Sequence, residues 1–512
     1  MWNEPPRSRM RRFATLTTSY NVLPIQMGEA MKHHTAALDS NYAPEAGHSN
    51  LMKRIGMGFT RLLHGHKTFD HGIYPIEHKE LTAHKPIRRL PFADELVIPL
   101  QQHKGRASVP IVKVGQEVVR GEPIAVADHF VSVPMHAPAT GVIRAIGLAP
   151  TAEGPKAQAI FLKVYHAASQ QVLYGTEHEP EHMNVKDIIQ AVQDAGLVGL
   201  GGGAFPSHVK MQPPAGRVIH TLLVNGCECE PYLTCDHRIM LEQTETLIRG
   251  IRIALRATRA ERAIIGVEDN KLDAVTHLRA RIPKHLPITV EAVRTKYPQG
   301  AEKMLISAVL NTEVPVGGLP ADVGVAVFNV GTLAQMGELV PQGRGLIERV
   351  VTVSGPAVKN PGNFLVPIGT PVRFLLDQVG LKGPLGQVIL GGPMMGMAVS
   401  SLDVPVTKSV SGVVALEPED PALARRQVYP CIKCGECLKA CPVSLNPSML
   451  GELAVAREYG VMTEQFNLDQ CFECGCCAFV CPSNIPLTQY FRIAKSINRD
   501  AQRRHEAKQT PH

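Results

Sequence analysis

Twelve cysteines occur in the 512 residues, and eight of them fall into two copies of one pattern. The first copy, Cys-x2-Cys-x2-Cys-x3-Cys-Pro, runs from Cys431 to Pro442, and the second runs from Cys471 to Pro482. Thiolates in this number hold zinc or iron–sulfur clusters. A secreted disulfide scaffold would be shorter and would spread its cysteines along the chain. The two copies therefore predict metal sites in a reducing compartment.

The spacing is that of bacterial two-cluster ferredoxins, in which the fourth cysteine of each copy binds the other cluster. A zinc ribbon needs only two Cys-x2-Cys pairs and would leave the third spacing and the Cys-Pro unexplained. We therefore expect two [4Fe–4S] clusters. The first is assigned Cys431, Cys434, Cys437 and Cys481, and the second Cys471, Cys474, Cys477 and Cys441. Cys476 falls outside the pattern and is expected to be a packed thiol.

A glycine-rich loop, GLVGLGGGAFPSHVK over residues 196–210, is the second chemical signal. Gly199, Gly201 and Ala204 satisfy a loose G-x-G-x-x-A pattern. A dinucleotide-binding fingerprint must follow a strand, however, and residues 185–195 have a helical pattern. Consecutive glycines still let backbone N–H groups approach a phosphate or a flat ring, and Lys210 adds a positive charge.

The elements that must position these motifs follow one another along the chain. Residues 92–165 contain short strand patterns joined by glycine turns, which predict a small β-barrel or sandwich. Residues 185–345 alternate helical and strand patterns, as α/β domains do. Residues 349–400 return to strand patterns before the cysteine copies begin. This succession agrees with the three or four domains that 512 residues suggest.

Composition excludes several classes of protein. Apolar residues make up 44% of the chain, which rules out disorder throughout. The net charge of +7 is too small for its length to indicate nucleic acid, although it suits an acidic partner or an anionic lipid surface. No apolar run is long enough for a spanning helix, so the sequence predicts a soluble or peripheral protein without a signal peptide.

Four segments resemble the NADH- and flavin-binding subunit of respiratory complex I. They are the glycine loop, residues 223–231 (similar to a NADESEP segment), residues 297–302 (similar to Tyr-x-x-Gly-Glu-Glu) and residues 328–333 (similar to NNVETL). Cys227 stands where an aspartate is usual, Ala301 replaces the first glutamate, and Phe328 replaces the first asparagine. Residues 92–165 resemble the barrel-sandwich hybrid fold of biotinyl and lipoyl carriers. Their lysine is absent from the tip Asp128-His129-Phe130, so no carrier function follows.

The order of these parts resembles the RnfC family, a subunit of the Rnf ion-translocating electron-transport complex, over roughly residues 68–490. The resemblance implies a multidomain α/β and β fold. Its parts are a disordered extension (1–60), a barrel-sandwich hybrid (61–170), an FMN/NADH-type α/β domain (171–347), an SLBB β-grasp-like domain (348–412), an α+β two-cluster ferredoxin domain (413–495) and a basic tail (496–512).

The resemblance also implies roles for individual residues around non-covalent FMN and NAD(H). The flavin would lie along Gly199, Gly201, Gly202 and Gly203, with Lys210 at its phosphate. The other residues expected at the flavin or nucleotide are Phe205, Asn225, Glu228, Glu230, Tyr297, Glu302 and Asn329. Phe205 and Tyr297 could instead pack in the core, and each glutamate could be a solvated loop carboxylate. No acid–base or nucleophilic catalytic residue is expected.

The implied function is that of a peripheral electron-input subunit, an NADH-linked oxidoreductase component of a membrane-bound, ion-translocating complex. Its expected partners are the other subunits, NADH and ferredoxin, and its expected place is the cytoplasmic face of the bacterial inner membrane. Two alternatives stay open. One is a soluble flavin and iron–sulfur reductase of the corrin reductase type. The other is a wiring subunit without catalysis, which the changes at Cys227 and Ala301 would fit.

Overall fold

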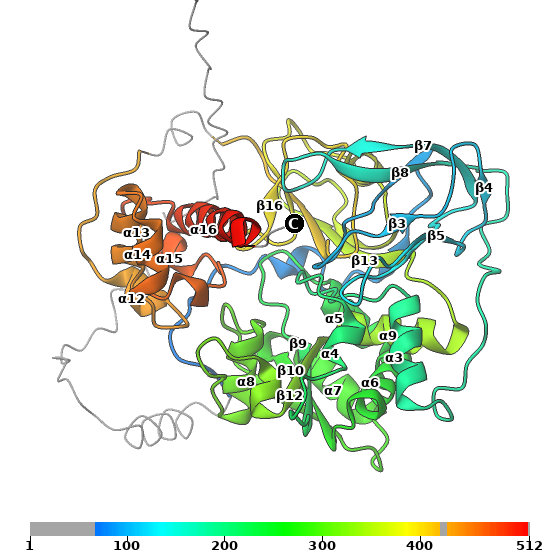
Figure 1. The fold of residues 1–512 in the computed structure, drawn as a ribbon, viewed down its shortest axis with the longest axis horizontal. Helices are drawn as coiled ribbons and strands as arrows, with labels where there is room; N and C mark the ends of the chain where they lie inside the picture. The colour runs from blue at the N-terminus through cyan, green and yellow to red at the C-terminus, as the bar shows by residue number, and fades with distance from the viewer. Residues whose placement is uncertain (1–66, 420–426, 510–512) are drawn as a thin grey trace, which may run out of the picture.

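The computed structural model describes residues 67–419 and 427–509, with side chains described up to residue 505. The expected extension, residues 1–60, lies outside these ranges. Figure 1 shows the α/β part in green, the barrel in cyan, the next sheet in yellow and the cysteine-rich part in orange and red. In the described ranges, no helix has both the length and the apolar character that crossing a membrane requires.

The barrel-sandwich part consists of two small antiparallel sheets. One has the order β2-β8-β7-β4 and the other β3-β5-β6. Alternate residues of β8, such as Ile160 and Leu162, are fully buried between the sheets because neighbouring side chains of a strand point to opposite faces. The strands are β2 (Glu95–Pro99), β3 (Val109–Pro110), β4 (Glu117–Val118), β5 (Pro123–Val126), β6 (Met135–His136), β7 (Gly141–Ala149) and β8 (Ala157–Val164).

The α/β domain is built on a parallel sheet with the order β11-β10-β9-β12. Leu222 and Val224 of β9 face one apolar core, whereas Leu223 faces a second core beneath α8. Both faces are covered, which explains the nearly continuous apolar strands. The elements are α3 (Val185–Asp194), α4 (Ser207–Lys210), β9 (Thr221–Gly226), α5 (Cys235–Glu242), α6 (Thr244–Thr258), β10 (Arg262–Glu268), η2 (Asp269–Lys271), α7 (Leu272–Arg281), β11 (Ile288–Val293), α8 (Glu302–Leu310), η3 (Pro320–Val323), β12 (Val325–Asn329) and α9 (Val330–Gln342).

The third part is a six-stranded sheet with the order β1-β14-β13-β17-β15-β16. Its edge strand β1 (Ile87–Arg89) comes from the segment expected in the barrel domain, and β17 (Gly412–Ala415) crosses the expected border at residue 412. Pairing with distant strands places both there, and local sequence pattern does not reveal such pairing. The other elements are β13 (Glu348–Ser354), β14 (Gly362–Pro367), α10 (Val372–Val379), β15 (Val388–Leu390) and β16 (Met397–Ala398), and η1 (Lys79–Leu81) precedes β1.

The cysteine-rich part repeats its backbone as well as its sequence. Gly435 and Gly475 have φ of 80° and 84°, values that glycine adopts without strain, and each precedes a short helix. Residues 427–509 contain helices and turns but no strand. The expected α+β domain is therefore helical here, because α13, α14 and α16 supply its core. Its helices are α12 (Glu436–Ala440), α13 (Pro447–Val455), α14 (Tyr459–Glu464), η4 (Leu468–Gln470), α15 (Cys476–Phe479) and α16 (Leu487–Gln509).

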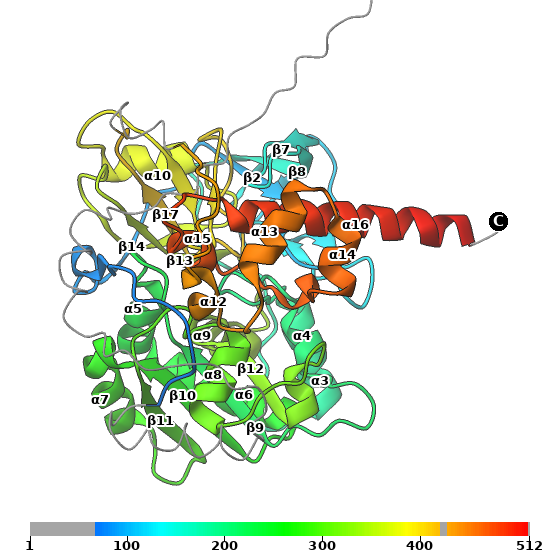
Figure 2. The same cartoon turned by 90° about the vertical axis from the view of Figure 1, so that its left-hand side faces the viewer.

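Helix α16 continues beyond residue 495, where the sequence suggested that a basic tail begins. Figure 2 shows it as one long helix that projects from the body of the protein. The structure thus has no break between the cysteine-rich domain and the residues expected to form the tail, up to residue 509.

Two glycines allow α6 and α9 to pack in close contact. A Cβ at Gly337 would lie 1.9 Å from the carbonyl oxygen of Thr246, and a Cβ at Gly250 would lie 1.8 Å from that of Leu333. Backbone atoms cannot move aside as a flexible side chain can. Small residues at both positions therefore fix the separation of the two helices on one face of the parallel sheet.

We predict that Gly337→Ala destabilises the protein although alanine is the better helix former by about 1 kcal/mol. Overpacking against the backbone should cost about 1–3 kcal/mol or more, seen as a lower midpoint of chemical unfolding. The matched control is Gly460→Ala in α14, where the nearest atom to the new Cβ is 4.0 Å away. Equal effects of the two substitutions would contradict the role assigned to close packing.

Candidate functional site

The carboxyl ends of β9 and β12 form the edge of the parallel sheet at which the chain changes direction. From β9 the chain builds outward through β10 and β11, then returns to place β12 on the other side of β9. Ligands of open α/β sheets bind at such switch points. Asn225 and Asn329 are register partners at these two strand ends, so two of the predicted site residues meet there.

The glycine loop lies beside this edge and is anchored at its base. The N–H of Gly199 donates to the carbonyl of Phe205 at 2.9 Å, and the N–H of Leu200 donates to Thr332 Oγ1 at 2.9 Å. A Cβ at Gly201 would lie 3.1 Å from the Asn329 amide, whereas Gly202 and Gly203 are exposed with no atom within 4 Å. The loop therefore presents open backbone next to Asn329, and Phe205 is partly buried behind it.

Both asparagines are held in place by the backbone around them. Asn329 Oδ1 accepts hydrogen bonds from the N–H groups of Gly331 and Thr332 and so caps α9. Asn225 Nδ2 donates to the carbonyl of Gly300 at 2.8 Å, and its Oδ1 accepts from the N–H of Cys227. These bonds fix the two amides at the strand ends.

Lys210 and Glu302, which the sequence assigned to different ligands, contact each other. Lys210 Nζ lies 2.7 Å from Glu302 Oε2 and donates to the carbonyl of Val327 in β12. The lysine side chain is 32% exposed and the glutamate side chain 36%, so both can reach a ligand. Their effects on ligand binding must therefore be coupled.

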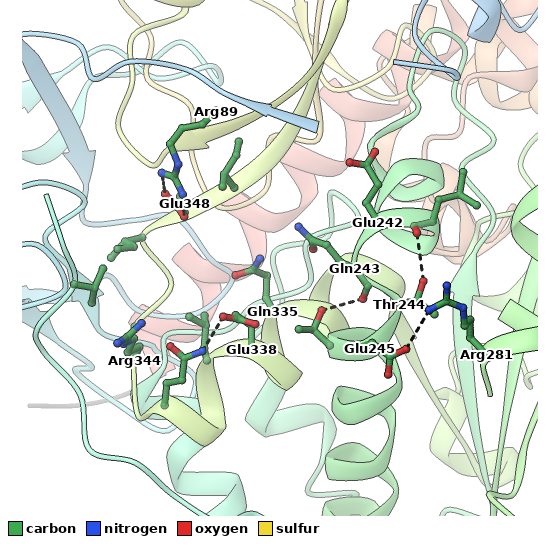
Figure 3. A pocket seen from close by; sticks show the side chains of 18 of the residues that line it. Arg89, Glu242, Gln243, Thr244, Glu245, Arg281, Gln335, Glu338, Arg344 and Glu348 are labelled. Carbon is green, nitrogen blue, oxygen red and sulfur yellow. Dashed lines mark hydrogen bonds and ion pairs between the residues drawn. The ribbon is translucent and has the colours of Figure 1, made fainter. Parts of the chain in front are cut away.

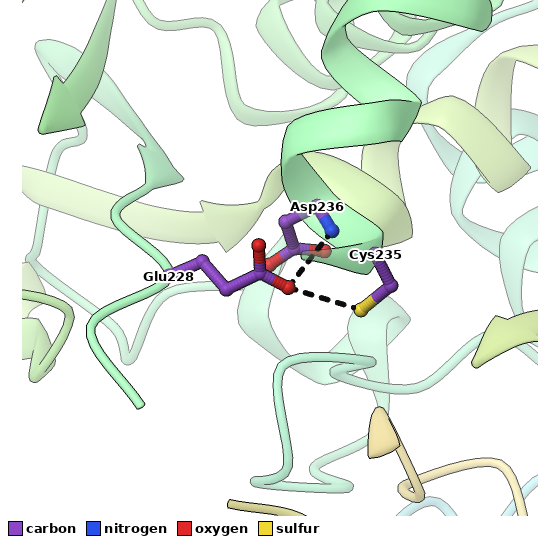
Figure 4. Close-up of side chains that lie close together, drawn as sticks. All are labelled: Glu228, Cys235 and Asp236. Carbon is purple, nitrogen blue, oxygen red and sulfur yellow. Dashed lines mark hydrogen bonds between the residues drawn. The ribbon is translucent and has the colours of Figure 1, made fainter. Parts of the chain in front are cut away.

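Glu228 is neither solvated nor free to bind a ligand. Its Oε1 accepts hydrogen bonds from the Cys235 thiol at 3.2 Å and the Asp236 N–H at 3.0 Å, and its Oε2 accepts from the N–H of His237 (Figure 4). The carboxylate thus caps the start of α5, which a negative charge stabilises. Burial and the nearby Glu228 charge raise the pKa of Asp236.

These hydrogen bonds explain why the donor atoms of Glu228, Cys235 and Asp236 lie within 4.8 Å of one another. Cys227 and Cys229, the other two cysteines outside the repeated pattern, are also held within the protein. The Cys227 thiol donates to the carbonyl of Gly266, and the Cys229 sulfur accepts from the N–H of Gly300.

Glu230 and Tyr297 lie where the α/β domain meets the other parts. The Glu230 oxygens accept from the N–H groups of Met394 and Met395 at 2.9 and 2.8 Å, and burial raises the pKa of this carboxyl to about 7. Tyr297 is 1% exposed, and its Oη donates to the carbonyl of Cys474 at 2.7 Å. Tyr297 therefore packs, as one of its two interpretations required, and Glu230 is not a solvated loop carboxylate.

The first predicted set of cluster cysteines surrounds one cavity. Its volume is about 300 Å³, and Cys431, Cys434, Cys437 and Cys481 all line it. Burial raises the pKa of the Cys437 thiol, and the nearby thiols of Cys434, Cys481 and Cys431 raise it further. The structure thus brings Cys481 of the second copy to the first three cysteines of the first copy.

The second predicted set is more deeply buried. Cys441, Cys474 and Cys477 are each less than 10% exposed, and Cys471 is partly buried. Burial raises the pKa of the Cys477 thiol, and the thiols of Cys474, Cys471 and Cys441 raise it further. Cys476 is fully buried and packs with Ile73 and Tyr297, as expected for a thiol outside the pattern.

Another cavity, of about 490 Å³, is lined by none of the predicted residues. It lies between α6, α9 and the edge of the six-stranded sheet. Figure 3 shows acidic and basic side chains facing one another within it, such as Arg89 with Glu348 and Arg281 with Glu245. This even mixture of charges selects no class of ligand.

Sequence reasoning missed Lys79, a buried cation beneath the site. Its Nζ donates to the carbonyls of Glu228, Glu230 and Leu233 at 2.6, 2.9 and 2.7 Å. Arg349 was also missed, and it donates to the carbonyl of Leu200 at the base of the glycine loop. Each residue contacts segments more than 100 positions away, so no local pattern indicated its role.

Four family models match successive parts of the chain. Residues 67–166 match the RnfC barrel sandwich hybrid domain, and residues 192–338 match the Nuo51 FMN-binding domain. Residues 350–398 match the SLBB domain, and residues 430–485 match the 4Fe-4S dicluster domain. The multidomain fold expected from the sequence is thereby confirmed.

Curated relatives match over most of the chain. The C component of a proton-translocating ferredoxin:NAD(+) oxidoreductase complex from Clostridium ljungdahlii is 42% identical over 86% of this chain and 96% of its own length. The Na(+)-translocating counterpart from Acetobacterium woodii is 39% identical over 76% and 87%. The C component of an ion-translocating oxidoreductase complex from Pseudomonas aeruginosa is 39% identical over 84% of this chain, which spans 56% of that longer protein.

We predict that Lys79→Met loosens the loop of residues 228–233. Three buried carbonyls would lose their donor, at roughly 1–3 kcal/mol for each group left unsatisfied. Thermal unfolding should show a clearly lower midpoint. Lys85→Met is the matched control, because Lys85 donates to the single carbonyl of Pro361 and is more exposed. A Lys79→Met midpoint no lower than that of the control would disprove the anchoring role.

Proposed function

Because the chain belongs to the RnfC family of ion-translocating ferredoxin:NAD(+) oxidoreductase complexes, we propose that it is the electron-input subunit of such a complex. In this role it exchanges electrons between NAD(H) and partner subunits or ferredoxin. The family match over FMN-binding and dicluster domains favours this function over a soluble reductase of the corrin reductase type. The single observation that carries the proposal is the meeting of the glycine loop with Asn225 and Asn329 at the switch point.

The residues at the switch point fit a non-covalent flavin. Open backbone at Gly202 and Gly203 suits a flat ring or a phosphate, and the Lys210 ammonium beside it suits an anion. Gln299, in the loop bonded to Asn225, is fully buried, and neither its Oε1 nor its Nε2 has a partner among the described residues. A buried amide normally requires one, so the loop suits a site completed by a bound group.

The residues proposed to hold the cofactors divide into three sets. Gly199, Gly201, Gly202, Gly203, Lys210, Asn225 and Asn329 would hold FMN, with Phe205 and Glu302 toward NAD(H). Cys431, Cys434, Cys437 and Cys481 would hold the first cluster, and Cys471, Cys474, Cys477 and Cys441 the second. When bound, FMN exchanges a hydride with NAD(H) and single electrons with the clusters. Glu228, Glu230 and Tyr297 would support this site through the protein contacts described above.

The proposed place of the protein is the cytoplasmic face of the bacterial inner membrane, held by contacts with membrane subunits. The net charge of +7 would add only a weak, salt-sensitive attraction to anionic lipid. Removing partner subunits, rather than adding detergent, should then release the protein from membranes.

We predict about eight irons and as many sulfides per chain after anaerobic assembly, from two four-iron clusters. Cys434→Ser should lower the iron content because it removes one of the thiolates around the 300 Å³ cavity. FMN content should stay unchanged, since Cys434 lies in a different domain from the glycine loop. Cys476→Ala is the control and should keep its iron. Stoichiometric zinc, or iron loss from both variants, would contradict the ligand assignment.

We predict that Lys210→Ala weakens FMN binding about ten- to a hundredfold. Charge-assisted contacts contribute roughly 1.5–3 kcal/mol, and a factor of ten corresponds to about 1.4 kcal/mol. Lys186→Ala, an exposed lysine of α3, is the matched control. Titration of the flavin-free protein with FMN measures the effect. Unchanged affinity in Lys210→Ala would remove the phosphate from this position.

Glu302→Ala should behave differently, because it frees the Lys210 ammonium from its 2.7 Å ion pair. FMN affinity should be kept, while anaerobic bleaching of the flavin by NADH becomes slower if Glu302 faces the nucleotide. Bleaching at the unmodified rate would mean that Glu302 serves only to pair with Lys210.

A further inference from the structure

The α/β domain meets the cysteine-rich domain through a small buried core. Side chains from several segments of the chain contribute to it: Ile73, Tyr297, Met394, Ala440, Cys474 and Cys476. The segment before Ile73 adds backbone contacts, because the N–H of Gly72 donates to the carbonyl of Ala440 and His71 Nδ1 lies 3.0 Å from that of Lys439. These contacts end one or two residues before Cys441, so this face of the domain belongs to the second set of cysteines.

Tyr297 is fixed at both of its ends within this core. Its backbone N–H and carbonyl both pair with Ile73, at 2.9 and 2.8 Å. Its phenol hydroxyl, on a side chain 1% exposed, donates to the carbonyl of Cys474 at 2.7 Å. The ring therefore spans the boundary and holds a ligand-bearing residue of the second set against the α/β domain.

The loop that carries Tyr297 continues to the flavin side. Three residues later, the carbonyl of Gly300 accepts from Asn225 Nδ2 at the end of β9. A Cβ at Gly300 would lie 2.4 Å from the carbonyl oxygen of Cys227, so the loop lies tightly against the strand end. One short loop thus contacts the proposed flavin site at one end and Cys474 at the other.

The first set of cysteines has different surroundings. The cavity that it lines is bordered by exposed apolar side chains, among them Tyr429, Ile432 and Val455. Cys434 is itself exposed. The second set therefore lies against the α/β domain, whereas the first opens toward the surface.

We propose that Tyr297 is a positioning residue that holds the second cluster at the flavin site, so that this cluster exchanges electrons with the flavin and the first cluster exchanges them with a protein partner. This inference rests on the proposed function. Each electron lost on the flavin side is gained by the second cluster, and then by the first, without a proton or a bond being transferred between them. Because electron transfer slows steeply with distance, loss of the phenol contact should slow the first of these steps. Hydrogen bonds and burial around a cluster also tune its potential.

The test is Tyr297→Phe in the full chain, assembled anaerobically with FMN and iron. The phenyl ring keeps the apolar packing and loses only the bond to the Cys474 carbonyl. We expect unchanged FMN and iron contents and unchanged flavin bleaching by NADH. Cluster reduction after bleaching should be at least about fivefold slower, and the electron paramagnetic resonance signal and midpoint potential of the second cluster should shift while those of the first do not. Tyr165→Phe, which removes an exposed phenol bonded to Glu117 in the barrel, should change none of these.

A second variant tests the same boundary from its exposed side. His71→Gly removes the contact with the Lys439 carbonyl, and glycine suits the φ of 62° at this position. It should slow cluster reduction in the same direction, by a smaller factor. Unmodified transfer rate and second-cluster signal in Tyr297→Phe would overturn the inference, as would loss of iron or FMN, which would make Tyr297 an assembly residue. If the unmodified protein binds no FMN or no iron, the proposed function itself fails.

Discussion

The Lys79 ammonium is the contact on which the arrangement of the domains depends. It donates to three carbonyls of residues 228–233 and is almost completely buried while doing so. That short loop then supplies Glu228 to the start of α5 and Glu230 to the N–H groups of Met394 and Met395. Gly475 of the cysteine-rich domain in turn packs against the carbonyl of Met394. One buried cation thus orders a loop that three domains share, and burying it requires all of its donors to be satisfied.

The departures from the complex I pattern fit these buried surroundings. Burial and the neighbouring Glu268 carboxylate raise the pKa of the Cys227 thiol, so this side chain stays neutral. Glu268 is itself fully buried and already paired with Lys271 at 2.8 Å. An aspartate at position 227 would add a second negative charge beside that pair, at a considerable cost in desolvation. At the other changed position, Ala301 precedes α8 without a capping side chain, and the acidic group of the first turn is Glu302.

The sequence was most informative where chemistry depends on spacing along the chain. The cysteine copies indicated that Cys481 joins the first three cysteines, and the helical pattern before the glycine loop excluded a Rossmann fingerprint; the structure agrees on both points. It was least informative where a role depends on a distant partner. Lys210 and Glu302 are separated by 92 positions and Tyr297 and Cys474 by 177, so their pairing follows from the tertiary fold alone. The same holds for β1, which joins a sheet whose other strands begin more than 250 residues later.

The unequal burial of the two cysteine sets has a consequence for handling in air. Dissolved oxygen reaches a cluster through solvent, and Cys434 is exposed whereas Cys441, Cys474 and Cys477 are buried. Oxidative damage should therefore be sequential. The first product of aeration would be a half-loaded protein that keeps the inner cluster and its contact with the flavin domain, and only longer exposure would give the iron-free chain. Iron analysis during timed aeration would detect this intermediate as a plateau at half the starting content. Such a protein would still accept electrons from its flavin while being unable to pass them on.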